Sequence, residues 1–352
     1  MGQLNEVTER HRFDIDRLHD YLRRELGGFA GPLQVAQFQG GQSNPTYLLT
    51  TPVRRYVMRS KPGPVAKLLP SAHAIEREFR VMRALRTQGI PVPEVLLLCE
   101  DEDVIGRAFF VMEHVDGRVF WDPALPGTSG PERAAVYDEM NRVIAALHGV
   151  DVAAAGLADF GRAGNYFERQ IGRWTKQYRA SETETIEAMN RLIEWLPAHV
   201  PPGDETTVVH GDFRLDNLIF HRSEPRVLAV IDWELSTLGH PLADFSYLCM
   251  SWHIPPGAFR GIAGLDHGTL GIPAEEQFIG SYCRRSGRHG IAHWNFYLAY
   301  NLFRIAAILQ GVYRRALDGM ASADNAMAAG ANAKALVEIG WGYARKADDR
   351  PV

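Results

Sequence analysis

The spacing of hydrophobic residues changes several times along the first third of the chain, and each change marks an expected element. Between residues 13 and 28, apolar side chains recur at three- and four-residue steps, which predicts a helix ending at Gly27 and Gly28. From Leu33 the period falls to two, and the segments LQVAQFQ, PTYLLTT and RRYVMRS are predicted strands. A helix is expected over residues 75–88, and VLLLCEDEDVIGRAFFVMEHVDG predicts two strands around an acidic turn. This region is therefore expected to be strand-rich with one principal helix.

The pattern after residue 117 is mainly helical. Helical spacing predicts helices over residues 132–148, within 166–196, and over 294–317 and 321–344. Aromatic residues of the second region fall on the apolar stripe, so we expect them to pack in the core. We place the boundary between the two predicted lobes after Asp116, giving residues 1–116 and 117–352, and the fold class is α+β.

Composition and charge narrow the class of protein. A chain of 352 residues is long enough for two domains, and its 46% hydrophobic and 23% charged residues are ordinary for a globular protein. A net charge of −4 and a pI near 6.4 do not favour nucleic acid or an anionic membrane as the main partner.

Cysteine usage and the N-terminal sequence favour a cytoplasmic protein. The three cysteines form no CxxC pair and no pattern typical of disulfides or zinc, so reduced thiols are expected. The first residues are charged and lack the apolar segment of a secretory signal. No run approaches the roughly 20 apolar residues of a membrane-spanning helix, so no membrane is expected as a partner.

The stretch VVHGDFRLDNLIFHRSEPRVLAVID, residues 208–232, carries the main candidate chemistry. It places Asp212, Asn217 and Asp232 at the ends of predicted strands. Two carboxylates and a carboxamide in this arrangement can hold Mg²⁺ against a nucleotide while a base receives a hydroxyl proton. The alternative is that these are ordinary turn residues, since Asp and Asn are common in turns for local reasons.

Two upstream features could complete a nucleotide site together with residues 208–232. The turn GGQSN contains Gly40 and Gly41, and successive N–H groups in such a turn can cradle phosphate oxygens, although two-glycine hairpins are common. Arg59 ends a predicted strand and Glu78 lies on the next helix, an arrangement that can fix a cation against nucleotide phosphates. The alternative is that Glu78 belongs to a solvated helix face.

The motifs GGQSN, YVMRSKPGP, HGDFRLDN and DWELSTLGHPLADFSYL resemble the aminoglycoside phosphotransferase family of kinase-like enzymes. Within it, they are most similar to the phosphotransferase-like domains that occur alone in bacteria or fused to acyl-CoA dehydrogenases. The resemblance covers nearly the whole chain and implies a bilobal, protein-kinase-like α+β fold, with nucleotide bound by residues 1–116. It also implies ATP and Mg²⁺ as cofactors, a small hydroxylated substrate and a functional link to acyl-CoA metabolism.

The resemblance assigns roles residue by residue. Asp212 would accept the proton of the acceptor hydroxyl, while Asn217 and Asp232 would bind Mg²⁺. His210 and Asp244 would support the catalytic loop. The nucleotide would be bound by a covering loop with Gly40, Gly41 and Ser43, by the pair Arg59 and Glu78 at its phosphates, and by the backbone of Glu113, His114 and Val115 at its adenine.

Several alternatives remain open. Arg59 stands where most members of the family have lysine, which allows a catalytically silent nucleotide-binding or scaffold protein; Lys61 or Lys67 could instead supply the charge. An aminoglycoside acceptor would favour a strongly acidic cleft, but 27 acidic against 22 basic residues from residue 120 onward is a modest excess. Aromatic residues around Trp252 and Trp294 suggest either a cleft wall for a hydroxylated acyl or carboxylate compound or simply core packing. A protein acceptor is disfavoured by the short gap between Asp232 and the LGHPLADF motif.

Overall fold

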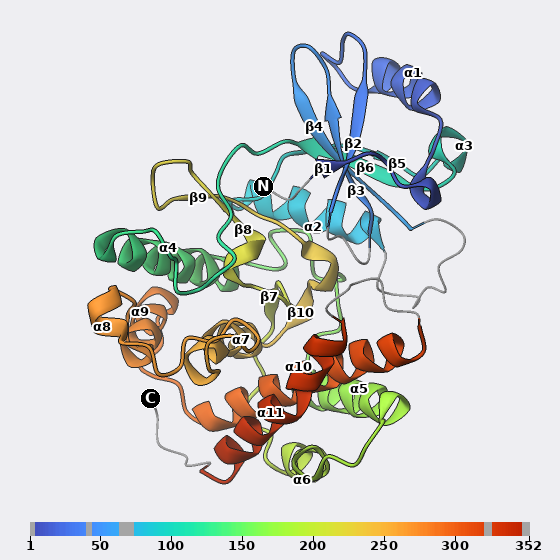
Figure 1. The fold of residues 1–352 in the computed structure, drawn as a ribbon. Coiled ribbons are helices and arrows are strands. Elements are labelled where there is room, and N and C mark those ends of the chain that lie inside the picture. Colours follow the sequence, from blue (N-terminus) through green and yellow to red (C-terminus); the bar gives the residue numbers. More distant parts are fainter. Residues whose placement is uncertain (1–3, 40–43, 63–73, 320–325, 347–352) are drawn as a thin grey trace. The chain divides into compact units, whose positions relative to one another are not determined.

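The computed structural model describes residues 4–39, 44–62, 74–319 and 326–346 (Figure 1). The chain forms two compact units that interleave along the sequence. Unit 1 comprises residues 1–119, 152–160 and 216–236, and unit 2 comprises residues 120–151, 161–215 and 237–352. These units are groups of residues with many mutual contacts, and they do not test the boundary of the predicted lobes. The lobes at residues 1–116 and 117–352 therefore stay a prediction.

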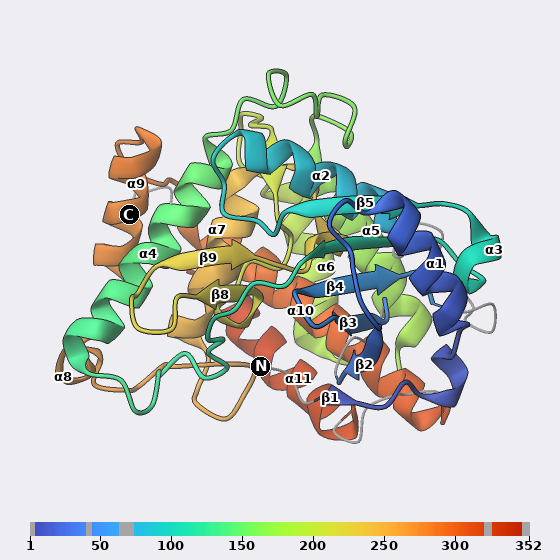
Figure 2. The same ribbon diagram turned by 90° about the horizontal axis from the view of Figure 1, so that it is seen from above.

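Unit 1 is built on a six-stranded antiparallel sheet with the order β1-β2-β3-β4-β6-β5 (Figure 2). The predicted strands around the first two turns are all present. The sheet also contains β1, which was not predicted, and the bounds of its strands are β1 (Leu4–Asn5), β2 (Gln34–Phe38), β3 (Thr46–Thr50), β4 (Arg55–Ser60), β5 (Val95–Cys99) and β6 (Phe109–Glu113).

The two faces of this sheet carry different partners because side chains alternate along each strand. Tyr56 and Met58 of β4 are buried in a cluster with Leu18 and Leu22 of α1 (Ile15–Glu25). Helix α2 (Ile75–Thr87) packs against β5 and β6. Arg59 lies between Met58 and Ser60 in the alternation and therefore points to the α2 side, as predicted.

The acidic turn between β5 and β6 contains a short helix that the sequence pattern did not predict. Helix α3 (Glu102–Ile105) begins where the Asp101 side chain accepts a hydrogen bond from the Asp103 N–H, and it ends at Gly106 with φ of 78°. The N-terminal helix α1 is likewise capped, by Asp14. In both helices a side chain caps the free backbone N–H groups of the first turn. A pattern of hydrophobic residues does not detect such a cap.

Two later segments complete unit 1. Residues 216–236 contain the hairpin of β8 (Leu218–Phe220) and β9 (Val227–Val230), followed by the 3₁₀ turn η3 (Trp233–Leu235). Arg118 exchanges two backbone hydrogen bonds of 2.8 Å with Phe220 on this hairpin. The segment 152–160 adds Phe160, whose carbonyl accepts a 2.6 Å hydrogen bond from Arg77 of α2.

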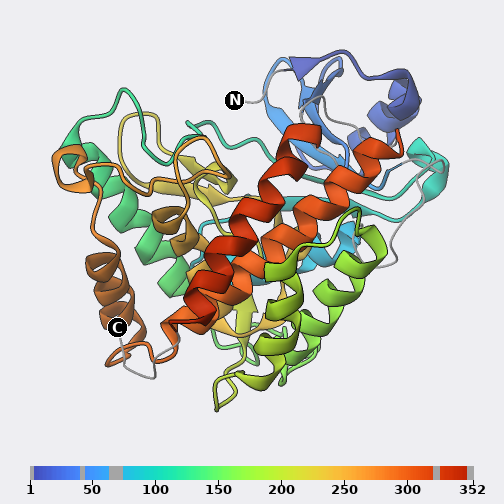
Figure 3. The same cartoon turned by 60° about the horizontal axis from the view of Figure 1, so that its bottom comes forward.

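Unit 2 is mostly helical. Figure 3 shows the long helices α10 and α11 side by side, with α5 packed against α10 and α6 against α11. The predicted helical regions are present, and α7 to α9 are further helices. The bounds are α4 (Gly130–His148), α5 (Tyr166–Ser181), α6 (Glu187–Ala198), α7 (Pro241–Cys249), α8 (His267–Leu270), α9 (Glu275–Ser286), α10 (Trp294–Leu317) and α11 (Ala326–Ala344).

A two-stranded ladder of β7 (Thr207–Val209) and β10 (Thr237–Gly239) lies within unit 2 and leads into the candidate site. The aromatic residues of α5, and those of α10 between Trp294 and Phe303, are buried, which confirms the core interpretation of the α5 stripe. None of the helices in the described part of the chain combines the length and apolarity needed to cross a membrane.

Candidate active site

The catalytic loop predicted at His210–Asn217 begins directly after β7. Asp244 of α7 holds its first turn, because its carboxylate accepts hydrogen bonds from the backbone N–H of His210 at 2.6 Å and of Gly211 at 2.9 Å. Gly211 has φ of 83°, which a residue with a side chain rarely adopts. The His210 ring is buried and its Nδ1 accepts the Asp212 N–H at 3.2 Å. The structure therefore places His210 and Asp244 as supports of the loop.

Asp244 remains a carboxylate although it is buried. Burial disfavours the charged form, but a 3.5 Å contact with His148 Nε2 and the hydrogen bonds from the loop hold the pKa of Asp244 below its ordinary value. The other ring nitrogen of His148 lies 2.8 Å from the Tyr282 hydroxyl. A chain of polar contacts behind the loop thus fixes its shape.

Asp212 itself is surrounded by donors. The Tyr247 hydroxyl donates to its Oδ1 at 2.5 Å, and the Arg214 Nε lies 3.2 Å from its Oδ2. Burial, followed by the charge of Asp212, raises the pKa of Tyr247 and keeps this phenol protonated. Arg304 lies over the Tyr247 ring, with its guanidinium carbon 5.1 Å from the ring centroid, and also donates to the Gly211 carbonyl. These contacts hold the Asp212 carboxylate in one direction, with its oxygens as hydrogen-bond acceptors.

Asn217 and Asp232 are brought together within unit 1 by the β8–β9 hairpin. Asn217 immediately precedes β8, Asp232 follows β9, and the Ile231 N–H donates to the Asn217 carbonyl at 2.9 Å. The Asp232 backbone has φ of 69° and ψ of 58°, a left-handed conformation that costs energy for a non-glycine residue. Such strain is commonly found at functional sites.

Arg59 lies at the centre of three carboxylates. Its Nε is 3.3 Å from Glu78 Oε1, and its Nη2 is 2.8 Å from Asp232 Oδ1 and 2.9 Å from Glu234 Oε2. Glu78 also accepts a 3.0 Å hydrogen bond from the buried Asn44 side chain. The predicted pairing of Arg59 with Glu78 is therefore present, and it includes Asp232.

One guanidinium cannot neutralise three acids, and the pKa values reflect this. Burial alone would lower the pKa of Arg59, but Glu78, Asp232 and Glu234 raise it above its ordinary value. Burial raises the pKa of Glu78 to about 7 despite Arg59, and the neighbouring carboxylates add to the rise. The cluster around Arg59 thus has an excess of negative charge.

The chemistry of these residues fits Mg²⁺. Asn217 and Asp232 supply hard oxygen donors, and Mg²⁺ is commonly held by one or two protein groups together with waters and substrate phosphates. The acidic excess around Arg59 would be offset by a cation. Within the described ranges no cluster of three His, Cys, Asp or Glu residues forms a site made of protein ligands alone.

The remaining predicted nucleotide residues have a mixed outcome. Gly40, Gly41 and Ser43 lie outside the described residues, as does Lys67. Lys61 forms an ion pair with Glu76 and does not take the place of Arg59. The last pairing of β6 is between Glu113 and Tyr56, so the backbone of His114 and Val115 lies beyond the sheet. The Glu113 side chain accepts the Glu94 N–H at 2.8 Å.

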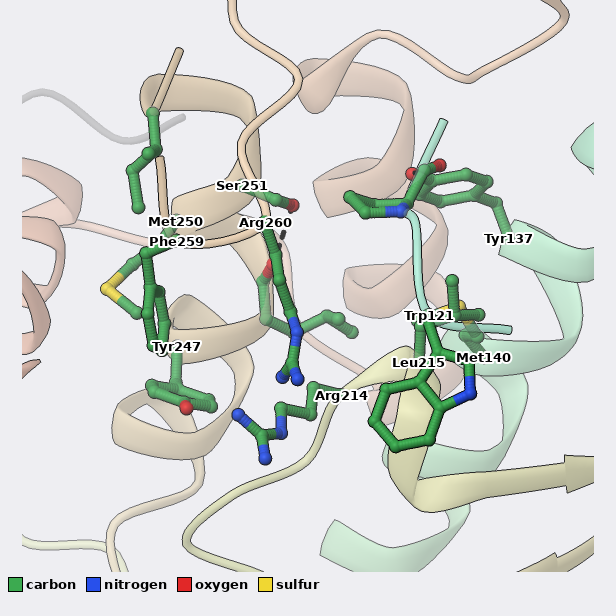
Figure 4. Close-up of a pocket in the computed structure, with 13 residues that line it drawn as sticks. Trp121, Tyr137, Met140, Arg214, Leu215, Tyr247, Met250, Ser251, Phe259 and Arg260 are labelled. Atoms are coloured by element: carbon green, nitrogen blue, oxygen red, sulfur yellow. Dashed lines mark hydrogen bonds between the residues drawn. The ribbon is translucent and has the colours of Figure 1, made fainter. Parts of the chain in front are cut away.

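A pocket lies next to Asp212 within unit 2 (Figure 4). The side chains of Arg214 and Arg260 point toward each other in it, with Trp121 on one side and Tyr247 and Phe259 on the other. The full lining is Trp121, Pro123, Tyr137, Met140, Arg214, Leu215, Tyr247, Leu248, Met250, Ser251, Ile254, Phe259 and Arg260.

The structure changes the prediction of the substrate wall. Trp252 and Trp294 are 6% and 4% exposed and pack in the core, so the core alternative is correct for them. Sequence reasoning missed Glu234 and Tyr247, although both lie in the motifs IDWE and HPLADFSYL. It also missed Arg260, for which no local pattern gave a signal, because the loop that carries it has no hydrophobic period.

Comparisons with known proteins identify the family of the chain. The family model described as "Phosphotransferase enzyme family" matches residues 34–278. A crystal structure from Ralstonia eutropha JMP134, carrying a provisional aminoglycoside phosphotransferase name, is 59% identical with a TM-score of 0.89 and covers 96% of this chain and 100% of that one. The aminoglycoside phosphotransferase APH(4)-Ia, in a ternary complex with AMP-PNP and hygromycin B, is 19% identical with a TM-score of 0.60 over 92% of this chain and 98% of its own, and it shares the fold.

Curated relatives are longer proteins. Acyl-CoA dehydrogenase family member 10 of Mus musculus is 50% identical over 94% of this chain and 31% of its own length. Acyl-CoA dehydrogenase family member 11 of Homo sapiens is 42% identical over 96% of this chain and 44% of its own length. The chain therefore spans less than half the length of these relatives. With the predicted α+β, protein-kinase-like fold confirmed, the chain belongs to the phosphotransferase enzyme family that includes the aminoglycoside phosphotransferases.

Proposed function

We propose that this protein transfers the γ-phosphate of ATP, in a Mg²⁺-dependent reaction, to a hydroxyl group of a small molecule such as a hydroxylated acyl or carboxylate compound. The observation that carries the proposal is the junction of Asn217, Asp232 and Arg59 in unit 1. Asp232 contacts the Arg59 guanidinium that is paired with Glu78, and Asn217 accepts a backbone hydrogen bond from the neighbouring Ile231, which supports a metal held by Asn217 and Asp232.

The residues have distinct roles in this proposal. Asp212 accepts the proton of the acceptor hydroxyl. The oxygen of that hydroxyl forms a bond to the γ-phosphorus, and the bond from this phosphorus to the β-phosphate oxygen breaks. Arg59, fixed by Glu78, contacts the nucleotide phosphates. Asn217 and Asp232 hold Mg²⁺, which neutralises phosphate charge when bound.

The nucleotide contacts rest on the family pattern. Gly40, Gly41 and Ser43 would cover the phosphates, and the backbone of Glu113, His114 and Val115 would bind adenine. The nucleotide analogue AMP-PNP in the complex of APH(4)-Ia supports ATP as the phosphate donor. The relatives named as acyl-CoA dehydrogenases support a functional link to acyl-CoA metabolism.

The test is an ATP-dependent phosphoryl-transfer assay over a panel of hydroxylated metabolites, including aminoglycosides. We expect Asp232→Asn to weaken Mg²⁺-dependent ATP binding in calorimetry and to abolish transfer. The matched control is Asp138→Asn, since this carboxylate pairs with Arg285 on the surface of unit 2. If Asp232→Asn transfers phosphate as well as the wild type, the metal assignment is wrong.

The same measurements address the catalytically silent alternative that Arg59 raises. Binding of Mg-ATP with no transfer to any acceptor would favour a nucleotide-binding or scaffold protein. Absence of Mg-ATP binding in the wild type would contradict both proposals.

A further inference from the structure

Arg304 of α10 is a buried cation behind the catalytic loop. Its side chain is 6% exposed, and within the described ranges no aspartate or glutamate forms an ion pair with it. Burying a charge is costly unless neighbouring groups compensate it. The groups that contact this guanidinium, described next, therefore supply the compensation.

Arg304 contacts both parts of the molecule that hold Asp212. Its Nη2 donates to the Gly211 carbonyl, which belongs to the peptide group directly before Asp212. Its guanidinium carbon lies 5.1 Å from the centroid of the Tyr247 ring, and a cation over an aromatic face is attracted by the π electrons. The hydroxyl of this tyrosine donates to the Asp212 carboxylate at 2.5 Å. One side chain thus contacts the backbone before the base and the phenol that bonds to it.

The peptide group between Gly211 and Asp212 is held at both ends. Its carbonyl accepts the hydrogen bond from Arg304, and its N–H donates to His210 Nδ1 at 3.2 Å. Glycine allows more backbone conformations than other residues, and Gly211 has φ of 83°. Rotation of this peptide would turn the Asp212 side chain. The bond from Arg304 opposes that rotation.

The same face of α10 also holds the helix that carries Tyr247. Asn301 lies three residues before Arg304, and residues at this spacing are neighbours on a helix surface. The buried Asn301 side chain donates to the Ser246 hydroxyl at 2.7 Å, and Ser246 directly precedes Tyr247 in α7. One face of α10 therefore fixes both α7 and the loop that contains Asp212.

The charge of Arg304 is coupled to that of Asp212. Burial would lower the pKa of Arg304, but neighbouring phenols and the Asp212 carboxylate raise it above its ordinary value. The guanidinium therefore stays a cation inside the unit, and the carboxylate of the base is one of the groups that compensate it.

We propose that Arg304 is a positioning residue, which fixes the Gly211–Asp212 peptide and the Tyr247 ring and thereby sets the direction of the Asp212 carboxylate. It acts through Asp212 and contacts no reacting atom. The inference rests on the proposed function for the role of Asp212 as the proton acceptor, whereas the effect on the loop is independent of turnover.

Hydrogen–deuterium exchange tests the effect on the loop. In Arg304→Met we expect the backbone amides of residues 210–212 to exchange about tenfold faster, because a hydrogen bond from a charged donor to the loop is lost. The amides of α4 should exchange at the wild-type rate. An unchanged rate at residues 210–212 would overturn the proposal, and an equal rise in α4 would show a general loss of stability instead.

Two further variants sharpen this measurement. Arg304→Lys keeps the charge but not the planar fork, so we expect a smaller rise at residues 210–212, and it serves as the test if Arg304→Met does not fold. Gln310→Met is the matched control, because Gln310 is buried on the same helix and donates to the Ser181 carbonyl at 2.9 Å. Faster exchange of residues 210–212 in this control would contradict a specific role of Arg304.

Steady-state kinetics then measures the effect on the base. With an acceptor that the wild type phosphorylates, we expect Arg304→Met to lower kcat about 10- to 100-fold and to change the KM for ATP less than about twofold. Arg304→Lys should recover part of the kcat, and Gln310→Met should keep the wild-type value. A kcat loss in the control as large as that in Arg304→Met would contradict the proposal.

The two measurements separate this inference from the proposed function. If the wild type phosphorylates no acceptor but residues 210–212 exchange faster in Arg304→Met, the positioning of the loop is supported and the proposed function fails. If the wild type is active and Arg304→Met changes neither exchange nor kcat, the proposed function stands and this inference is wrong.

Discussion

The surroundings of Arg59 and of Asp212 are opposites in charge. In unit 1, one guanidinium is shared by Glu78, Asp232 and Glu234. In unit 2, the Asp212 carboxylate has Tyr247 and Arg214 as partners, and Arg260 points into the adjoining pocket. In the first cluster three carboxylates contact one cation, and in the second a phenol and a guanidinium contact one carboxylate.

The difference suggests what each cluster is built to receive. A cluster with too many carboxylates is stabilised by a cation, which agrees with the proposed Mg²⁺ at Asn217 and Asp232. A carboxylate that is contacted by a phenol and a guanidinium is held in one direction, which agrees with the proposed role of Asp212 as the group that receives the hydroxyl proton. Charge substitutions in the two units should therefore have different signatures, and they are given below from the largest expected effect to the smallest.

The substitution Asp212→Asn removes the acceptor of the hydroxyl proton. We expect kcat to fall about 10²- to 10⁴-fold, because this is the usual contribution of general acid–base catalysis. The KM for ATP should change little, since the nucleotide contacts are assigned to unit 1. Steady-state kinetics on a phosphorylated acceptor would check this. A kcat within threefold of the wild type would show that Asp212 is not the base.

The substitution Arg59→Met leaves three carboxylates without their cation. We expect a loss of about 3 kcal/mol of stability at pH 8, as for other broken buried ion pairs. The loss should be smaller at pH 6. Because burial raises the pKa of Glu78 to about 7, its charge costs stability as the pH rises from 4.5 to 7, and removing Arg59 increases that cost.

Urea unfolding at the two pH values would measure this effect. Arg191→Met is the matched control, since Arg191 pairs with Glu187 on an exposed helix face and should contribute less than about 1 kcal/mol. Arg59→Lys should retain much of the stability. An Arg59→Met variant as stable as the wild type at pH 8 would contradict the charge surplus.

The substitution Asp244→Asn tests the support of the catalytic loop. We expect a loss of about 2 kcal/mol at pH 7, because a charged acceptor of two backbone N–H groups is replaced by a neutral one. The folded pKa of Asp244 is lowered, so its contribution is present above the ordinary pKa of 3.8 and is lost as the pH falls further. The stability difference between variant and wild type should therefore shrink in acid.

Thermal unfolding between pH 3 and pH 7 would follow this change. The control is Asp266→Asn, because Asp266 caps a short helix at the surface and Asn caps helices equally well. A difference that stays constant down to pH 3 would show that the Asp244 charge does not support the loop.

The substitution Tyr247→Phe removes one hydrogen bond to Asp212. We expect kcat to fall about tenfold with an unchanged KM for ATP, because one hydrogen bond to a charged group is lost while the base remains. Tyr343→Phe removes a half-buried hydroxyl that contacts His253 and should leave kcat unchanged. An unaltered kcat in Tyr247→Phe would mean that Arg214 and the loop backbone alone orient Asp212.

The parts of the site that the sequence predicted are those fixed by local pattern. The period of two ended a predicted strand at Arg59, and the helical spacing that follows put Glu78 on the next helix. Asp212 and Asn217 were marked by their places at the ends of predicted strands and by the resemblance of HGDFRLDN to the phosphotransferase family. The fold class followed from the change of hydrophobic period along the chain.

The parts that the sequence did not predict depend on contacts between distant segments. Tyr247 meets Asp212 across 35 positions, and Glu234 meets Arg59 across 175. Arg260 enters the pocket because of a left-handed backbone, and no periodic signal marks such a residue. The exposed or buried state of Trp252 and Trp294 was equally undetermined, since a helical stripe of aromatics fits a cleft wall as well as a core.

The interleaving of the two units has a consequence for how the gene segment of this protein can recombine. Unit 1 takes its residues from three separated stretches of the chain, and so does unit 2. A recombination event at any single boundary between the units would divide at least one of them. The gene segment for nearly the whole chain therefore has to travel as one block. The mouse and human relatives show such a block, since they match 94% and 96% of this chain within much longer proteins.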